Sequence, residues 1–216
     1  WATSEVANLQ VYLCRDELNS TNAKFRIKNQ AGTINLTSSY IPDIYNNQRW
    51  NIAVSVRPEK YKLIGNVVST ADPTYKLEFY GVTHAFGDVR SEFLLTASLD
   101  YATGTKYLSN AKRFYAGAHL TNFTGAVVQS SDLQLGSFRF YEDYLDKTII
   151  REHNLDPTNY GVKGNTTPAT AYAYEITASV PRNDLIALNW SFDTVTGSDA
   201  SGDFIVEDLT SGVAAS

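Results

Sequence analysis

The 216-residue chain contains no methionine and a single cysteine, Cys14. Because translation starts with methionine, we expect a processed chain or part of a longer protein. A lone cysteine excludes an intrachain disulfide, and a chain of this length buries a core without one. No base that would activate the thiol is identifiable, which favours a buried or edge cysteine over a nucleophile.

Charge is also scarce. Charged residues make up 19% of the chain and the formal net charge is −5. Lysine and arginine form no run, and phosphate binding needs clustered basic side chains, so we expect no nucleic-acid partner. No apolar run reaches the ~18 residues of a membrane-spanning helix, so we expect no membrane insertion.

Motifs for catalysis are missing as well. His84, His119 and His153 lie far apart and form no HxxxH or HxH pair, and no GxSxG segment occurs. A retaining glycosidase needs two carboxylates ~5 Å apart in one cleft. The adjacent acids at 142–143 and 207–208 instead point to opposite faces of a strand. We therefore expect no enzymatic activity, with glycoside hydrolysis as a remote alternative.

Alternating apolar segments are abundant, and 12% of the residues are aromatic. Phe25 and Ile27, for example, fall on one face of an extended segment, with polar residues between them. Short strands separated by turn residues predict an all-β protein, a sandwich or a barrel. The expected strands are 8–16, 23–29, 32–40, 49–58, 61–68, 75–86, 91–100, 112–120 and 133–145, followed by two more after residue 185.

One short helix is expected, at residues 146–154. Asp146 is its predicted N-cap residue, because the carboxylate can accept backbone N–H bonds. His153 near its end is expected to interact with the last carbonyls and the helix dipole. In the preceding strand, Arg139 should face water. The acids and the histidine of this region are interpreted as caps and solvated charges rather than as an active site.

The composition changes after about residue 162, where small polar residues dominate. We expect a main domain at residues 1–175. Residues 176–216 would then form a connector or the start of a following module, with the boundary between residues 170 and 180.

Three segments together resemble a known family. They are "YNNQRWNIAVSV" (45–56), "KRFYAGAH" (112–119) and "LQLGSFRFYEDYLDKTIIREHN" (133–154). Their order and spacing over residues 44–161 are similar to those of laminin-G-like domains of the concanavalin A-like class. The resemblance implies an antiparallel two-sheet jelly roll that commonly binds carbohydrate or protein. The tail resembles connectors in large modular virion structural proteins of phages and other viruses.

Two functions follow as expectations. The first is a non-enzymatic structural or decorating module at a virion or extracellular surface. Its partners would be other copies or other structural proteins, with some contact to surface glycans. The alternative is a lectin-like adhesin domain, whose main task is to bind those glycans.

Glycan binding needs exposed rings that stack on sugars and amides that bind hydroxyls. Two loops combine these residue types, although ordinary turns have a similar composition. The candidate residues are Tyr45, Asn46, Asn47, Asn159 and Tyr160.

Ca²⁺ is the one metal for which the sequence offers candidates. Laminin-G-like domains often hold calcium at a rim, and aspartate oxygens in glycine-containing loops suit that ion. Ordinary aspartate-rich turns are the alternative interpretation. The candidate ligands are Asp88, Asp132, Asp199 and Asp203.

Overall fold

A computed structural model of the chain contains two compact units, residues 1–131 and 132–216. The predicted strand 61–68 and the predicted domain boundary between residues 170 and 180 lie outside the residues that the structure describes. Those residues are 8–59, 74–110, 114, 116, 118–120, 127–130, 134–156, 186–198 and 204–208.

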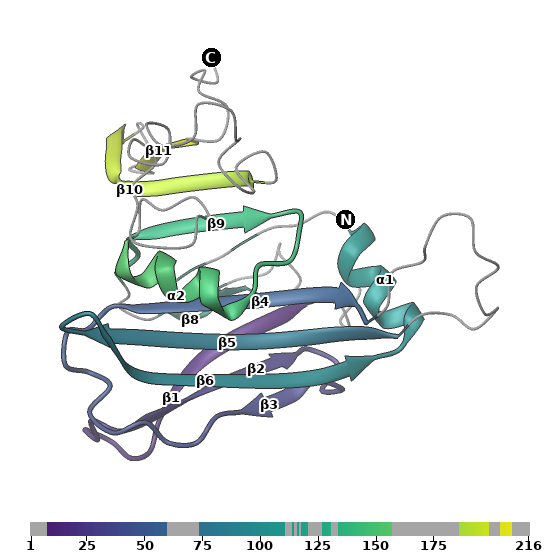
Figure 1. The fold of residues 1–216 in the computed structure, drawn as a ribbon, viewed down its shortest axis with the longest axis horizontal. Coiled ribbons are helices and arrows are strands. Elements are labelled where there is room, and N and C mark those ends of the chain that lie inside the picture. Colours follow the sequence, from purple (N-terminus) through teal and green to yellow (C-terminus); the bar gives the residue numbers. More distant parts are fainter. Residues whose placement is uncertain are drawn as a thin grey trace. The chain divides into compact units, whose positions relative to one another are not determined.

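Unit 1 is built around two three-stranded antiparallel sheets (Figure 1). One sheet has the order β1-β2-β3 and the other the order β4-β5-β6, and β7 pairs with β8. The strands are β1 (Leu9–Arg15), β2 (Ala23–Asn29), β3 (Asn35–Thr37), β4 (Trp50–Pro58), β5 (Tyr75–Ala85), β6 (Asp88–Leu99), β7 (Ala118–Leu120) and β8 (Val127–Ser130).

Strand β2 follows its sequence pattern closely. Every second residue is buried, and Phe25 and Ile27 are 6% and 0% exposed. Asn29 ends the strand as a buried polar residue, and its side chain is hydrogen-bonded on both sides. Its Oδ1 accepts from the Ile34 N–H at 3.0 Å, and its Nδ2 donates to Thr33 Oγ1 at 2.8 Å. Asn29 thereby fixes the turn into β3.

The two sheets of unit 1 share one core. The Phe25 ring of β2 lies 5.0 Å from the Trp50 ring of β4 and 4.9 Å from the Phe93 ring of β6. Leu77 and Phe79, in the middle strand β5, are fully buried in the same cluster. Burying each such side chain stabilises the fold by about 1.5–3 kcal/mol. The apolar faces of the two sheets therefore pack against each other.

The β5–β6 hairpin has a two-residue tip, Phe86 and Gly87, with φ angles of 55° and 91°. Two positive φ angles are typical of the turn that matches the twist of a hairpin. The register shifts between Thr83 and His84, so that Thr83 pairs with Ser91 and His84 with Val89. Arg90 is left as the extra residue of a β-bulge.

Helix α1 (Tyr101–Ser109) corrects the expectation of a single helix. Its N-cap is Asp100, whose carboxylate accepts the Thr103 N–H at 2.6 Å; this bond lowers the pKa of Asp100. Gly104 in the middle obscured the helix, because glycine costs about 1 kcal/mol of helix propensity. The packing explains the glycine, since a Cβ atom at this position would lie 2.2 Å from the Tyr75 ring.

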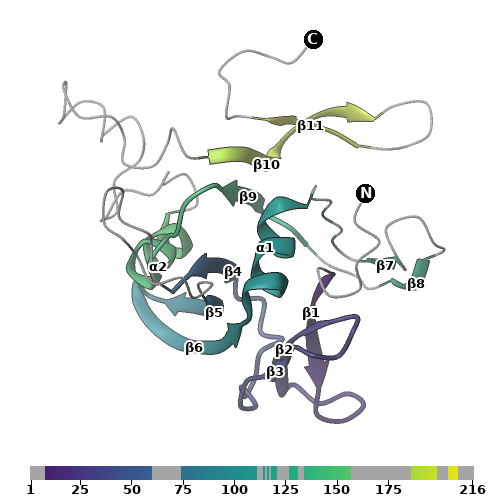
Figure 2. The ribbon, with the colours of Figure 1, turned by 90° about the vertical axis from the view of Figure 1, so that its right-hand side faces the viewer.

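Unit 2 contains β9 (Ser137–Tyr141), α2 (Lys147–Leu155), β10 (Ile186–Ser198) and β11 (Phe204–Asp208), and its sheet has the order β11-β10-β9 (Figure 2). The predicted helix at 146–154 is confirmed as α2. Its predicted cap is confirmed too, because the Asp146 carboxylate accepts the N–H groups of Thr148 and Ile149 at 2.8 and 3.1 Å.

Arg139 of β9 does not face water as expected. It is half-buried, and its Nε donates to Asn189 Oδ1 at 3.1 Å. Asn189 lies directly opposite on β10, and its backbone N–H donates to the Asp208 carboxylate on β11 at 3.0 Å. The burial of Arg139 depends on its cross-strand partner Asn189, and the alternation of residues within β9 does not predict it.

The described residues are thus mostly β-strands in antiparallel sheets, with two short helices. This agrees with the predicted β-rich class. Neither of these helices has the length and hydropathy needed to cross a membrane.

Candidate functional site

A hollow of about 360 Å³ opens at one end of unit 1. Its wall combines the loop that leads from β3 into β4 with the end of the β5–β6 hairpin. Polar and apolar residues share the lining: Asp43, Asn46, Gln48, Thr83, Arg90 and Ser91 lie beside Ile41, Pro42, Ile44 and Trp50. This volume lies near the lower end of the range for small-molecule sites.

The loop is anchored at its start by apolar side chains and backbone bonds. Ile41 and Ile44 are 9% and 6% exposed and belong to the core. The Ile41 N–H donates to the Ala23 carbonyl at 2.8 Å, and the Ile44 N–H donates to the Thr21 carbonyl at 2.9 Å. This side of the hollow is therefore formed by a fixed segment of backbone.

Two residues of the loop have left-handed backbone, Asp43 with φ 52° and Asn47 with φ 62°. Aspartate and asparagine tolerate this conformation better than most residues. Asn46 also closes a local turn, because its Oδ1 accepts the Gln48 N–H at 3.1 Å. Part of the asparagine-rich composition is therefore explained by the path of the backbone alone.

The charged wall of the hollow is an ion pair between Arg90 and Asp43, whose nearest nitrogen and oxygen are 3.5 Å apart. The bulge of β6 supplies Arg90, and bulges often redirect a side chain in this way. The two side chains are 41% and 57% exposed. A surface pair of this kind contributes only about 0–1 kcal/mol, so a ligand can separate the two side chains at little cost.

Trp50 and Thr83, which line the hollow, are fixed by contacts with other parts of unit 1. Trp50 packs against Phe25 and Phe93 in the core, with ring centroids 5.0 and 6.4 Å away. Thr83 Oγ1 donates to the Arg49 carbonyl at 2.9 Å and ties the end of the loop to β5. Trp50 and Thr83 are therefore held in place before any ligand arrives.

Of the residues predicted to bind glycan, Asn46 lines the hollow. Tyr45 and Asn47 belong to the same loop but are not among the lining residues. The Arg15 guanidinium lies 4.1 Å from the centre of the Tyr45 ring and covers one of its faces. Asn159 and Tyr160 lie outside the described residues.

For calcium, the structure describes one predicted ligand, Asp88, which is exposed at the start of β6. Asp132, Asp199 and Asp203 lie outside the described residues. Within the part of the chain that the structure describes, no three His, Cys, Asp or Glu side chains cluster as metal ligands would.

The loop predicted to bind glycan, within residues 41–50, forms part of the hollow. Most of the side chains that line the hollow were not predicted. Asp43, Gln48 and Trp50 lie within that segment, so polar residues before an aromatic strand were a usable signal. Arg90 was missed because a bulge determines its direction. The dipeptide Phe86-Gly87 indicates a turn, but nothing in the sequence indicates the bulge at Arg90.

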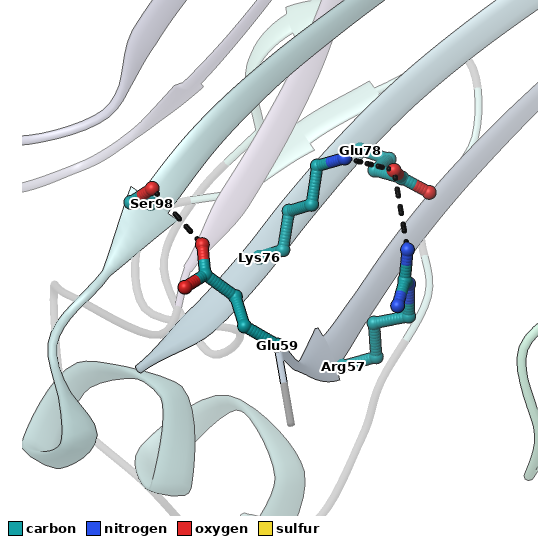
Figure 3. Close-up of polar contacts among 5 residues, drawn as sticks. All are labelled: Arg57, Glu59, Lys76, Glu78 and Ser98. Carbon is teal, nitrogen blue, oxygen red and sulfur yellow. Dashed lines mark hydrogen bonds and ion pairs between the residues drawn. The ribbon is translucent and has the colours of Figure 1, made fainter. Parts of the chain in front are cut away.

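A second cluster of charges lies on the face of the sheet β4-β5-β6 that is turned away from the core residues Leu77 and Phe79 (Figure 3). Glu78 is 8% exposed, and its carboxylate lies 2.8 Å from Lys76 Nζ and 3.6 Å from the Arg57 guanidinium. Glu59 nearby accepts from Ser98 Oγ at 3.2 Å and from Thr74 Oγ1 at 2.5 Å. Because two cations surround the buried carboxylate, this cluster is suited to holding strands together.

In unit 2, His153 stacks on Tyr141 with ring centroids 6.0 Å apart. Burial, and to a smaller extent the charge of Arg139, lower the pKa of His153 to about 4, although Asp156 acts in the opposite direction. The imidazole is therefore neutral at neutral pH. A neutral imidazole has no charge with which to stabilise the helix dipole, so the expected interaction with the dipole is weak at neutral pH.

Comparisons with protein-family models, with curated proteins and with solved structures found no match for this chain.

Proposed function

We propose that the chain is a non-enzymatic module of a larger virion or extracellular assembly and that it contacts a surface glycan through the hollow. The observation that carries this proposal is the lining, which combines Trp50 with polar side chains such as Asp43, Asn46 and Arg90. Sugars present flat C–H faces to aromatic rings and hydroxyls to amides and charged groups. Asp43 accepts hydrogen bonds, Arg90 donates them, and the amide side chains of Asn46 and Gln48 do both.

A binding role fits this lining better than hydrolysis does. Glycoside hydrolysis uses two carboxyl groups on either side of the bond that breaks. Among the described residues that line the hollow, Asp43 is the one with a carboxylate, so they do not supply such a pair.

The jelly-roll topology and the laminin-G-like resemblance are part of the same proposal. Two antiparallel sheets that share a core, with Trp50 at the start of β4, are compatible with such a domain. A lectin-like adhesin would use the same hollow as its main activity, and an assembly module would use it as an additional contact.

The test is a glycan array with the whole chain, carried out with calcium and with a chelator. We expect a defined group of hits for the wild type. Arg90→Ala should weaken binding by about 10- to 100-fold, because a hydrogen bond to a charged group contributes about 1.5–3 kcal/mol. Loss of the hits in chelator would add calcium to the site.

Arg26→Ala is the matched control, because this half-buried arginine lies on β2 and does not line the hollow. It should bind as the wild type does. A blank array from folded protein, or equal binding by both arginine variants, would refute the hollow as a glycan site.

A further inference from the structure

Strand β1 forms the border of the sheet β1-β2-β3 (Figure 2). It has seven residues, pairs with β2 without any register shift, and contains no proline. Its one charged residue, Arg15, is the last of the strand. Proteins usually protect such edges with prolines, bulges, inward charges or very short strands. Strand β1 uses none of these protections along its first six residues.

The hydrogen bonds of β2 show which backbone groups of β1 point outward. Ala23 exchanges both of its bonds with Ile41, on the β3 side, and Phe25 bonds to Ser38 on that side. The N–H and C=O groups alternate in direction along a strand, so Lys24 and Arg26 point to β1.

Lys24 and Arg26 lie opposite Cys14 and Tyr12, whose backbone groups therefore point back to β2. The alternate residues of β1 must then direct their N–H and C=O groups to the open edge. These residues are Leu9, Val11, Leu13 and Arg15.

The same alternate residues carry exposed apolar side chains. Val11 is 44% exposed and Leu13 is 40% exposed, although they lie opposite Ile27 and Phe25, which are buried. An apolar side chain on the core face is exposed to this degree because nothing in the described structure extends the sheet beyond β1. One more strand would cover both side chains and satisfy the outward backbone groups together.

We propose that β1 pairs antiparallel with β1 of a second copy of the chain, around a two-fold axis at Tyr12. This register places Val11 of each copy opposite Leu13 of the other, as a hydrogen-bonded pair, and Leu9 opposite Arg15 in the same way. All the outward groups of the strand are used, the two exposed apolar residues cover each other, and no like charges are opposed. Such self-complementarity is what a two-fold interface requires.

Shifting the axis to Val11 or to Leu13 makes the pairing worse. Around Val11, Leu9 would lie opposite Leu13 and Arg15 would lie beyond the end of the partner strand. Around Leu13, Val11 would lie opposite the charged Arg15. The register around Tyr12 alone uses the full strand and also places the two exposed apolar residues, Val11 and Leu13, against each other.

The first test is sedimentation velocity with the whole chain over about a hundred-fold range of concentration, because a reversible dimer depends on concentration. We expect a dimer for the wild type. The variant Val11→Lys with Leu13→Lys places lysines opposite each other twice and should weaken the dimer at least tenfold. Val11→Lys with Leu13→Glu places opposite charges together and should restore it.

Leu94→Lys is the surface control, because Leu94 is a similarly exposed apolar residue of the other sheet; it should leave the dimer unchanged. A monomer at every concentration would overturn the proposal. The candidate partner of β1 would then be an extended segment of another protein. A dimer that tolerates the two lysines would also overturn it.

Crosslinking tests the register without relying on charged variants. Tyr12→Cys, in a Cys14→Ser background, would place two sulfurs across the two-fold axis at a non-hydrogen-bonded pair, where Cα atoms are about 4.5 Å apart. We expect a disulfide-linked dimer on mild oxidation. Gln10→Cys in the same background should not crosslink, because the two copies of residue 10 are four positions apart. Equal crosslinking of both, or of neither, would refute this register.

The proposal does not depend on a ligand in the hollow. A chain that dimerises but binds no glycan would refute the proposed function alone, and a monomer that binds glycan would refute the dimer alone.

Discussion

Phe86 has an unfavourable backbone conformation for its residue type. Its φ angle is 55°, and its side chain is fully exposed at the tip of the β5–β6 hairpin. The turn requires positive φ at this position, and asparagine adopts it more easily than a bulky aromatic residue. Gly87 beside it meets the same requirement without strain. The hairpin therefore carries a local cost that packing does not offset.

Replacing Phe86 with asparagine should stabilise unit 1 by about 1 kcal/mol, because it relieves the strain and removes no buried contact. Urea unfolding of the variant and the wild type measures the change. Phe86→Ala is the control, since alanine removes the ring but keeps the unfavourable φ, and should gain less. Equal stability of all three proteins would argue against strain at this turn.

The Glu78 carboxylate neutralises two cations that the pairing of β4 with β5 places side by side. Lys76 of β5 and Arg57 of β4 are directly opposite in the sheet, and the Glu78 carboxylate contacts both (Figure 3). Like charges in this position destabilise a pair of strands. We therefore expect Glu78→Gln to lower the free energy of unfolding by about 2 kcal/mol.

Thermal or urea unfolding would measure the effect of Glu78→Gln. The paired change Glu78→Gln with Lys76→Gln removes one of the opposed cations and should recover part of the loss. If the single and double variants are equally stable, charge balance is not the role of Glu78.

At the scale of whole elements, α1 shows a conflict between propensity and packing. Gly104 weakens the helix, but the Tyr75 ring occupies the space that a side chain would need. Gly104→Ala should therefore destabilise the protein by about 2 kcal/mol, because overpacking outweighs the gain in helix propensity.

Ala102→Gly, at an exposed position of α1, should cost about 1 kcal/mol by propensity alone. Urea unfolding of both variants compares the two effects. A stabilising Gly104→Ala would show that Tyr75 moves away without cost and that packing does not require the glycine.

Helix α2 should respond to pH through His153. The pKa of this residue is about 4 in the folded protein, below its ordinary value of 6.5. The unfolded chain therefore binds the proton first, and stability falls as pH drops from 6.5 towards 4. The loss amounts to about 3 kcal/mol once the pH is below both values.

Hydrogen-exchange protection factors of the α2 amides, at neutral pH and at about pH 4.5, measure this loss. His153→Phe keeps a ring against Tyr141 but cannot be protonated, so its protection should depend less on pH. The same pH dependence in both proteins would assign the effect to other groups.

The sequence predicted some elements well, and the reasons are local. Strand β2 was predicted with its exact bounds, because its alternation and its flanking turns agree. Helix α2 was recognised by the spacing of Leu145, Ile149 and Ile150, and its capping aspartate was predicted with it. Helix α1 was missed because Gly104 is explained only by Tyr75, which is 29 positions earlier. Local sequence patterns predict a helix or strand when residues close in the sequence determine its formation.

At the scale of the whole molecule, contacts between distant segments build the candidate site. The hollow combines a loop at residues 41–50 with a bulge at Arg90, and alternation within one strand does not reveal such a meeting. The same holds for the core, where Phe25 meets Phe93 across two sheets. The sequence therefore predicted a β-rich fold and one wall of the site, but not the other wall.

The proposed glycan contact is tested most directly by a ¹⁵N–¹H NMR titration of the chain with a panel of methyl glycosides. At least one glycoside should shift the amide signals of Asn46, Gln48 and Ser91, which line the hollow. Signals of β2, such as that of Arg26, should stay in place. Folded protein with no shift at the hollow for any glycoside, or with shifts confined to other surfaces, would contradict the account.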